Sequence, residues 1–95
     1  MSYFNPESDQ KVFVFALSTC VHCRRAKDLL DDLGVDYGHV EVDLLDEDVV
    51  DAAMEEMERY NPALTFPTIV FSTNRVIVGY KADDIRQEVE KMAKK

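Results

Sequence analysis

Cys20 and Cys23, separated by two residues, are the side chains in this sequence best suited to chemistry, and they are its only cysteines. Two thiols at this spacing can close a small disulfide ring and open it again. One thiolate of such a pair can attack a disulfide in another molecule, and the second thiol can then release the product. The spacing therefore indicates thiol–disulfide exchange.

The cysteine pair lies where a strand is expected to end and a helix to begin. The apolar run at 11–17, rich in valine and phenylalanine, predicts a buried strand before the pair. Because Cys20 would then lie near the helix N-terminus, unpaired N–H groups and the helix dipole favour its thiolate over its thiol. The helix itself is indicated by four apolar residues at helical spacing: Ala26, Leu29, Leu30 and Leu33.

Other roles for the pair have less support. A structural disulfide is disfavoured because residues 1–10 lack the basic and apolar regions of a signal peptide, and because so short a ring restricts the unfolded chain little. A zinc site needs four ligands, and beyond the two thiols the usual nitrogen ligands are only His22 and His39. A metal half-site shared between two chains and a pair of inert cysteines are the lesser alternatives.

Composition limits the size of the fold and the choice of partners. The 95 residues are 46% hydrophobic, enough for one core, so we expect a single domain over 11–95 after an N-terminal extension over 1–10. The formal net charge of −8 argues against a nucleic-acid partner, because phosphates would be repelled. No apolar run approaches the length of a membrane span, and the expected location is the reducing cytoplasm.

The sequence after the first helix predicts a second strand and a second helix. Gly34 lies where a glycine commonly ends a helix, and residues 36–43 predict a strand. Because a helix separates the first two strands, they should be parallel and joined by a right-handed crossover. The segment 46–60 predicts a helix with an apolar stripe formed by Val50, Ala53, Met54 and Met57.

The C-terminal part predicts a hairpin and a last helix. A strand at 67–72 opens on a proline, and a turn at 73–74 leads into a strand at 75–79. Asp83 suits the N-cap of a helix that reaches about Ala93. The predicted order is β-α-β-α-β-β-α, an α/β protein with four strands and three helices.

Three features in this order resemble the glutaredoxins of the thioredoxin-like superfamily. They are the Cys-x-x-Cys after the first strand, the Thr-Phe-Pro-Thr segment at 65–68 and the Gly79-Tyr80 pair before the last helix. The resemblance covers residues 11–92. It implies a three-layer fold in which a four-stranded mixed sheet is flanked by three helices.

The chemistry and the resemblance together imply a dithiol–disulfide oxidoreductase. Cys20 is expected to attack a substrate disulfide as a thiolate, and Cys23, buried and protonated inside the helix, to resolve the mixed disulfide. His22 is expected to tune the pair, because an imidazole can carry charge or donate an N–H; its alternative is an exposed linker residue. Lys27 adds positive potential, or simply pairs with Asp31 one helical turn away.

The resemblance also implies a substrate-binding segment. It places a cis peptide bond before Pro67, close to the nucleophile, and leaves the backbone of Phe66 free to pair with the substrate as an added strand. Lys81 would reach a carboxylate of a glutathione-like ligand, and Asp83 or Asp84 its amino group. The complete expected set of substrate-binding residues is Thr65, Phe66, Pro67, Gly79, Tyr80, Lys81 and Asp83.

The sequence leaves the electron donor open between glutathione or another low-molecular-weight thiol and an enzyme of the thioredoxin-reductase type. Glutathione-using glutaredoxins typically carry a lysine two residues before the first cysteine, where this chain has Ser18, and a Gly-Gly pair where it has Gly79-Tyr80. The segment 79–81 looks more like the redoxins that feed electrons to ribonucleotide reductase. We expect a monomer with no metal and no permanently bound cofactor. The alternative is a dimer that binds or carries an iron–sulfur cluster, bridged through Cys20.

Overall fold

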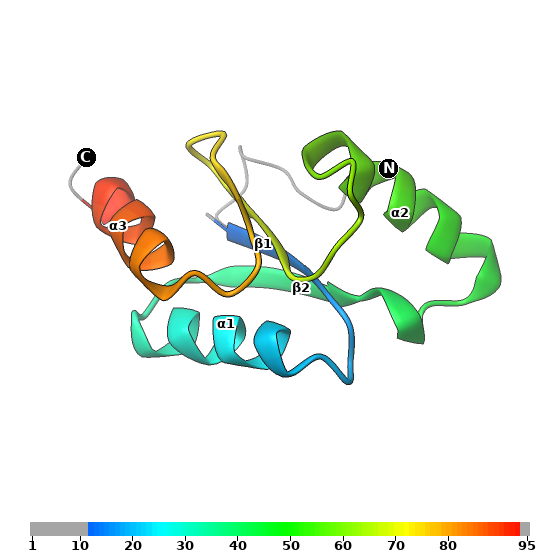
Figure 1. Cartoon of the computed structure of the whole chain (residues 1–95), viewed down its shortest axis with the longest axis horizontal. Coiled ribbons are helices and arrows are strands. Elements are labelled where there is room, and N and C mark those ends of the chain that lie inside the picture. The colour runs from blue at the N-terminus through cyan, green and yellow to red at the C-terminus, as the bar shows by residue number, and fades with distance from the viewer. Residues whose placement is uncertain (1–11, 94–95) are drawn as a thin grey trace.

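The computed structural model describes residues 12–93, and its elements follow the predicted order of strands and helices (Figure 1). The strands are β1 Val12–Ala16, β2 Tyr37–Glu41, β3 Thr68–Phe71 and β4 Val76–Val78. The helices are α1 Val21–Asp32, α2 Glu47–Tyr60, α3 Ala82–Ala93 and the short 3-10 helix η1 Val42–Leu44. The proposed N-terminal extension, 1–10, lies outside the described residues.

The four strands form one mixed sheet in the order β2-β1-β3-β4. Strand β1 is parallel to β2, as expected for two strands joined through a helix, and antiparallel to β3, which pairs antiparallel with β4. In the register of β1 and β2, Val14 lies opposite His39 and Ala16 opposite Glu41. The sheet therefore brings the end of β2 next to the loop that carries the cysteines.

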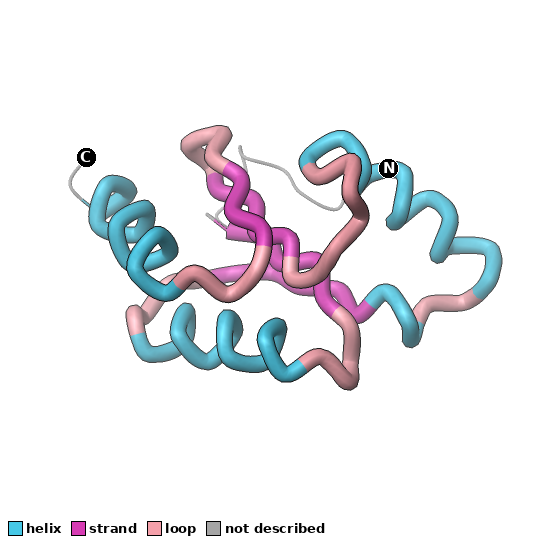
Figure 2. Tube along the Cα trace, in the orientation of Figure 1, coloured by secondary structure: helices cyan, strands magenta, loops and turns pink. Residues whose placement is uncertain are grey.

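The helices cover the sheet on two sides, which gives three layers. Alternate residues of β1 face opposite ways: Val12, Val14 and Ala16 pack with α1 and α3, whereas Phe13 and Phe15 pack with Met57 of α2. Figure 2 shows the strands between α1 and α2. The expected three-layer, four-stranded fold is confirmed, and no helix within residues 12–93 is long and apolar enough to cross a membrane.

Gly34 ends α1 as the sequence predicts. Its φ of 71° is in the left-handed region, where glycine is not strained. The N–H of Gly34 donates to Asp31 O at 3.0 Å, and that of Val35 donates to Leu30 O at 3.1 Å. These two bonds form a Schellman motif, which satisfies the last carbonyls of the helix and turns the chain toward β2.

The second predicted strand is shorter than expected. The sequence predicted a strand through Asp43, but β2 ends at Glu41 and the chain turns into η1. Val42 is buried at this turn, and Leu45 donates its N–H to Val42 O at 3.3 Å. The alternation of polar and apolar residues could not predict that the strand ends at Glu41, because the position of Asp43 depends on a contact with a residue far away in the sequence.

The start of the last helix also differs. Asp83 is not its N-cap, because the helix begins at Ala82 and the N–H of Ile85 already donates to Lys81 O at 2.9 Å. Asp83 and Asp84 lie instead in the first turn, where their charges suit the positive end of the helix dipole.

Candidate active site

Cys20 is the N-cap residue of α1. Its backbone is extended, with φ −88° and ψ 115°, and its Sγ accepts a hydrogen bond from the N–H of Cys23 at 3.2 Å. The N–H of Arg24 donates to Cys20 O at 3.1 Å. The sulfur therefore lies at the end of the helix where backbone N–H groups favour negative charge, and its residue is partly exposed.

Cys23 lies one turn into the same helix in a different environment. It is 0% exposed and belongs to the apolar cluster between the sheet, α1 and α3. Burial, followed by its interaction with Cys20, raises the pKa of the Cys23 thiol to about 12, although a hydrogen bond with the Leu17 backbone and, to a lesser extent, the charge of Lys27 act in the opposite direction. Both cysteines are free thiols in the structure.

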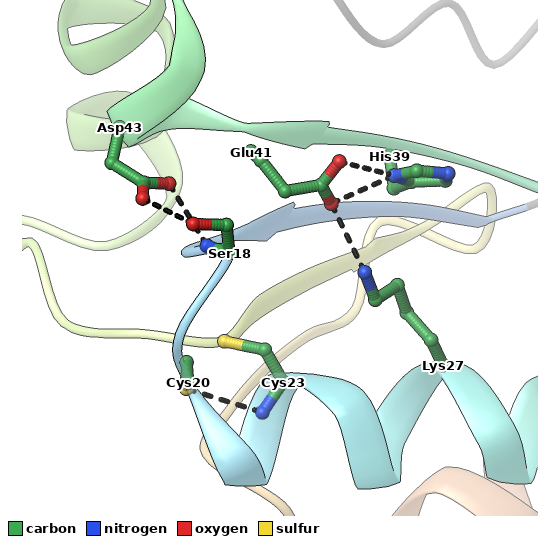
Figure 3. A network of polar contacts seen from close by, with 7 residues as sticks. All are labelled: Ser18, Cys20, Cys23, Lys27, His39, Glu41 and Asp43. Atoms are coloured by element: carbon green, nitrogen blue, oxygen red, sulfur yellow. Dashed lines mark hydrogen bonds and ion pairs between the residues drawn. The ribbon is translucent and has the colours of Figure 1, made fainter.

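The loop before Cys20 is held by Ser18. Its backbone N–H donates to Asp43 Oδ1 at 2.9 Å, and its hydroxyl donates to Oδ2 at 2.5 Å (Figure 3). The position that carries a lysine in glutathione-using relatives thus has a structural role here.

Lys27 pairs with a residue that the sequence did not suggest. Its Nζ lies 3.1 Å from Glu41 Oε2 on β2, so the predicted pairing with Asp31 is wrong. His39 Nδ1 lies 2.8 Å from the same oxygen (Figure 3). Burial alone would raise the pKa of Glu41, but hydrogen bonds from Lys27 and His39 outweigh it and hold that pKa below its ordinary value.

A cavity of about 420 Å³ lies beside Cys20, between α1 and β2. Basic and acidic residues of α1 face Tyr37 and His39 of β2 across it. Burial, then the nearby Asp31, raises the pKa of Tyr37 to about 12. The complete lining is Leu17, Ser18, Cys20, Arg24, Lys27, Asp28, Asp31, Tyr37 and His39.

The segment before β3 has the backbone form that the resemblance implied. The Phe66-Pro67 peptide bond is cis, and Pro67 O accepts a hydrogen bond from the N–H of Gly79 at 2.8 Å. The ring of Phe66 packs against the same cluster as Cys20 and Tyr80. Within residues 12–93, no backbone hydrogen bond engages the N–H or C=O of Phe66.

Asn61 organises this segment, and sequence reasoning missed it. It is 5% exposed, and its Nδ2 donates to Thr65 O at 3.2 Å, to Thr65 Oγ1 at 3.1 Å and to Thr68 Oγ1 at 3.0 Å. The N–H of Ala63 donates to Asn61 Oδ1 at 3.1 Å. Thr65 thus already forms hydrogen bonds within the protein. The sequence signal for this network was an asparagine at the end of a helix, followed closely by two threonines.

The structure shows fewer contacts between the other expected site residues and the cysteines. Gly79 has a φ of 88°, and Tyr80 packs on the cluster that contains Cys23. Lys81 is exposed, and Asp83 is exposed with its carboxylate 3.8 Å from Arg86. His22 is exposed on α1, and within residues 12–93 it forms no ion pair or side-chain hydrogen bond. In that same part of the chain, no three His, Cys, Asp or Glu residues are grouped to hold a metal ion.

Comparisons with known proteins identify the family. The glutaredoxin family model matches residues 12–76. The crystal structure of methanoredoxin from Methanosarcina acetivorans is 43% identical, with 83% of each chain covered and a TM-score of 0.78. That of the glutaredoxin from Methanosarcina mazei Go1 is 44% identical, with 84% of this chain and 78% of that one covered and a TM-score of 0.76.

A more distant structure shows the same fold. The glutaredoxin (grx-1) from Archaeoglobus fulgidus is 23% identical, with 88% of this chain and 90% of that one covered and a TM-score of 0.80. Glutaredoxins are thiol oxidoreductases that act with disulfide substrates and thiol reductants. With a Cys-x-x-Cys at the start of α1, a thioredoxin-like fold and a family match over more than half its length, the chain belongs to the glutaredoxin family.

Proposed function

We propose that this protein is a dithiol–disulfide oxidoreductase that reduces protein or small-molecule disulfides through Cys20 and Cys23. The observation that carries the proposal is the contrast between the two thiols. Cys20 is partly exposed at the helix N-terminus and opens into a cavity, whereas Cys23 is fully buried and its pKa is raised to about 12. Such a pair suits an attacking cysteine and a resolving cysteine.

The proposed reaction has two exchange steps. The Cys20 thiolate attacks one sulfur of the substrate disulfide, forms a mixed disulfide and releases the first substrate thiol. Cys23 then attacks Cys20 Sγ, which forms the intramolecular disulfide and releases the second thiol. The free N–H and C=O of Phe66 support docking of a substrate backbone as a short added strand beside Cys20.

The proposed reductant is an external thiol or a thioredoxin-reductase-type enzyme, with no permanently bound cofactor. Two observations favour a donor other than glutathione: Ser18 is engaged by Asp43 and offers no cation, and Tyr80 follows Gly79 in place of a second glycine. Reduction of a small disulfide should be measured with glutathione and glutathione reductase, and separately with thioredoxin reductase. The faster system identifies the donor class.

The roles of the cysteines are tested by trapping. After incubation with a disulfide substrate, Cys23→Ser should retain a mixed disulfide that mass spectrometry detects, and Cys20→Ser should not. In the reduced wild-type protein, iodoacetamide at mildly acidic pH should label Cys20 first, because Cys23 is buried and protonated. Trapping on Cys23 instead, or faster labelling of Cys23, would reverse the assignment.

A further inference from the structure

The second exchange step requires a negative charge on the sulfur of Cys23, and the buried position of this residue disfavours that charge. Cys23 must attack as a thiolate, but its burial in the apolar cluster raises the pKa of its thiol and disfavours that charge. The buried thiol has no carboxylate or imidazole among its described interactions that could remove its proton. A nearby cation would increase the thiolate fraction directly.

Lys27 is the cation whose position suits this role. It lies four residues after Cys23 on α1, so the two side chains share one face of the helix. Its Nζ is fixed 3.1 Å from Glu41 Oε2, and its side chain is only 23% exposed. Figure 3 shows Lys27 extending from α1 toward Glu41 of β2, to the right of the two cysteines and on the same side of the helix as the Cys23 side chain.

The other charged groups around the cavity differ from Lys27. Arg24, Asp28 and Asp31 line it from α1, and all three are exposed, so water screens their charges. From β2 come Tyr37, which burial keeps protonated, and His39, whose ring nitrogen is bound to Glu41. Among the charged residues that line the cavity, Lys27 is therefore the one whose positive charge is partly buried and held by an ion pair.

We propose that Lys27, held in place by Glu41, stabilises the thiolate that Cys23 forms when it displaces the substrate from Cys20. This role rests on the proposed dithiol reaction and makes Lys27 a positioning residue of its second step. In that step the bond between Cys20 Sγ and the substrate sulfur breaks, and the bond between Cys20 Sγ and Cys23 Sγ forms. The departing substrate thiolate takes up the proton that Cys23 lost, while the dithiol is oxidised and the substrate disulfide is reduced.

The two steps can be timed separately with a neutral aromatic disulfide, such as 4,4′-dithiodipyridine, that releases a coloured thiol at each step. The first phase depends on substrate concentration and reports attack by Cys20; the second does not and reports attack by Cys23. In Lys27→Met the second phase should be about threefold slower at neutral pH. One pKa unit lowers the thiolate fraction about tenfold, and the higher nucleophilicity of a more basic thiolate recovers about threefold of that loss.

Matched variants separate a charge effect from a structural one. Lys27→Arg keeps the charge and should leave the second phase within about twofold of wild type. Arg25→Met removes a charge from the same helix, on the side that faces Tyr80 and Arg86 rather than the Cys20 cavity, and should also leave it unchanged. Lys27→Arg and Arg25→Met should also leave the first phase within about twofold, and Lys27→Met should slow the second phase more than the first.

The possible failures are distinguishable. If Cys23→Ser keeps the second phase, the dithiol reaction itself is wrong. If Cys23→Ser loses that phase but Lys27→Met leaves its rate unchanged, only the role of Lys27 is wrong. A Lys27→Arg variant as slow as Lys27→Met, or an equally slow Arg25→Met, would also overturn the proposal, because charge at this position would then not be the cause.

Discussion

Ser18 and Asp43 are joined by two hydrogen bonds across 25 positions of sequence: the Ser18 backbone N–H donates to Asp43 Oδ1 and its hydroxyl to Oδ2. The contact ties the loop before α1 to η1, which follows β2 (Figure 3). Cys20 lies two residues after Ser18, so this contact fixes the approach of the chain to the nucleophile.

The same contact predicts an acid-dependent part of the stability. The two bonds from Ser18 hold the pKa of Asp43 below its ordinary value. A carboxyl with a lower pKa in the folded state adds stability above its unfolded pKa, and this is lost as the pH falls through the folded pKa. Asp43→Asn should therefore lower the free energy of unfolding at neutral pH, with a difference from wild type that shrinks below about pH 4. Urea unfolding at neutral pH and near pH 3 measures this; an equal difference at both would contradict it.

His22 is predicted to tune the redox equilibrium weakly. Its ring can carry charge or donate an N–H near the Cys20 thiolate, but the residue is exposed, so water screens the effect. His22→Val should make the disulfide less oxidising by less than tenfold in its equilibrium with a thiol buffer, or about 30 mV. Val21→Ala, a neighbouring exposed position, is the control. If His22→Val also leaves the equilibrium unchanged within error, the imidazole is only a linker residue.

The sequence predicted the order of elements because the signals for it are local. The apolar run of β1, the left-handed glycine after α1 and the spacing of apolar residues in α2 each depend on neighbours along the chain. The cysteine pair was placed correctly at the start of α1 for the same reason, since it follows a strand and precedes a helical pattern.

Contacts between distant residues could not be predicted in the same way. A periodic pattern tells which face of a helix carries Lys27, but not which acidic residue lies within reach of it. Glu41 reaches Lys27 because the parallel register places it opposite Ala16, beside the cysteine loop. Asn61 was missed because an asparagine after a helix normally marks a turn, and its burial arises only when the segment before β3 folds over it.

Glu88 is predicted to stabilise the contact between α3 and the β3–β4 turn. Its carboxylate is 3% exposed, accepts a hydrogen bond from the Thr73 hydroxyl and lies 3.6 Å from Arg75 and 4.0 Å from Lys91. Glu88→Ala should lower the free energy of unfolding by about 1–3 kcal/mol, because the Thr73 hydroxyl loses a hydrogen bond to a charged acceptor. Glu90→Ala, an exposed position on the same helix, should change it by less than about 0.5 kcal/mol. Equal effects of the two substitutions on the free energy of urea unfolding would show that the contacts of the Glu88 carboxylate do not contribute to stability.

Asn61 is predicted to couple stability to substrate binding. Its amide donates to Thr65 and Thr68 on either side of Phe66, so it shapes the segment whose free backbone groups are proposed to dock the substrate. Asn61→Asp keeps the size of the side chain but removes the amide donor, and its carboxylate would face the carbonyl of Thr65. The free energy of unfolding should fall by about 1–3 kcal/mol. In the folded protein, KM for a peptide disulfide should rise, while the rate at which Cys20 reacts with a small alkylating reagent should not change.

Thr68→Val tests whether this coupling runs through the hydrogen-bond network. The substitution conserves shape but removes the hydroxyl that accepts from Asn61 and donates to Thr65 O at 2.8 Å. Because the two side chains share these bonds, the effects of Asn61→Asp and Thr68→Val on unfolding should not be additive, and the double variant should lose less stability than the sum of the single losses. Additive losses, or an unchanged KM in both variants, would mean that the segment keeps its shape without Asn61 and that substrate docking is fixed by the packing of Phe66 instead.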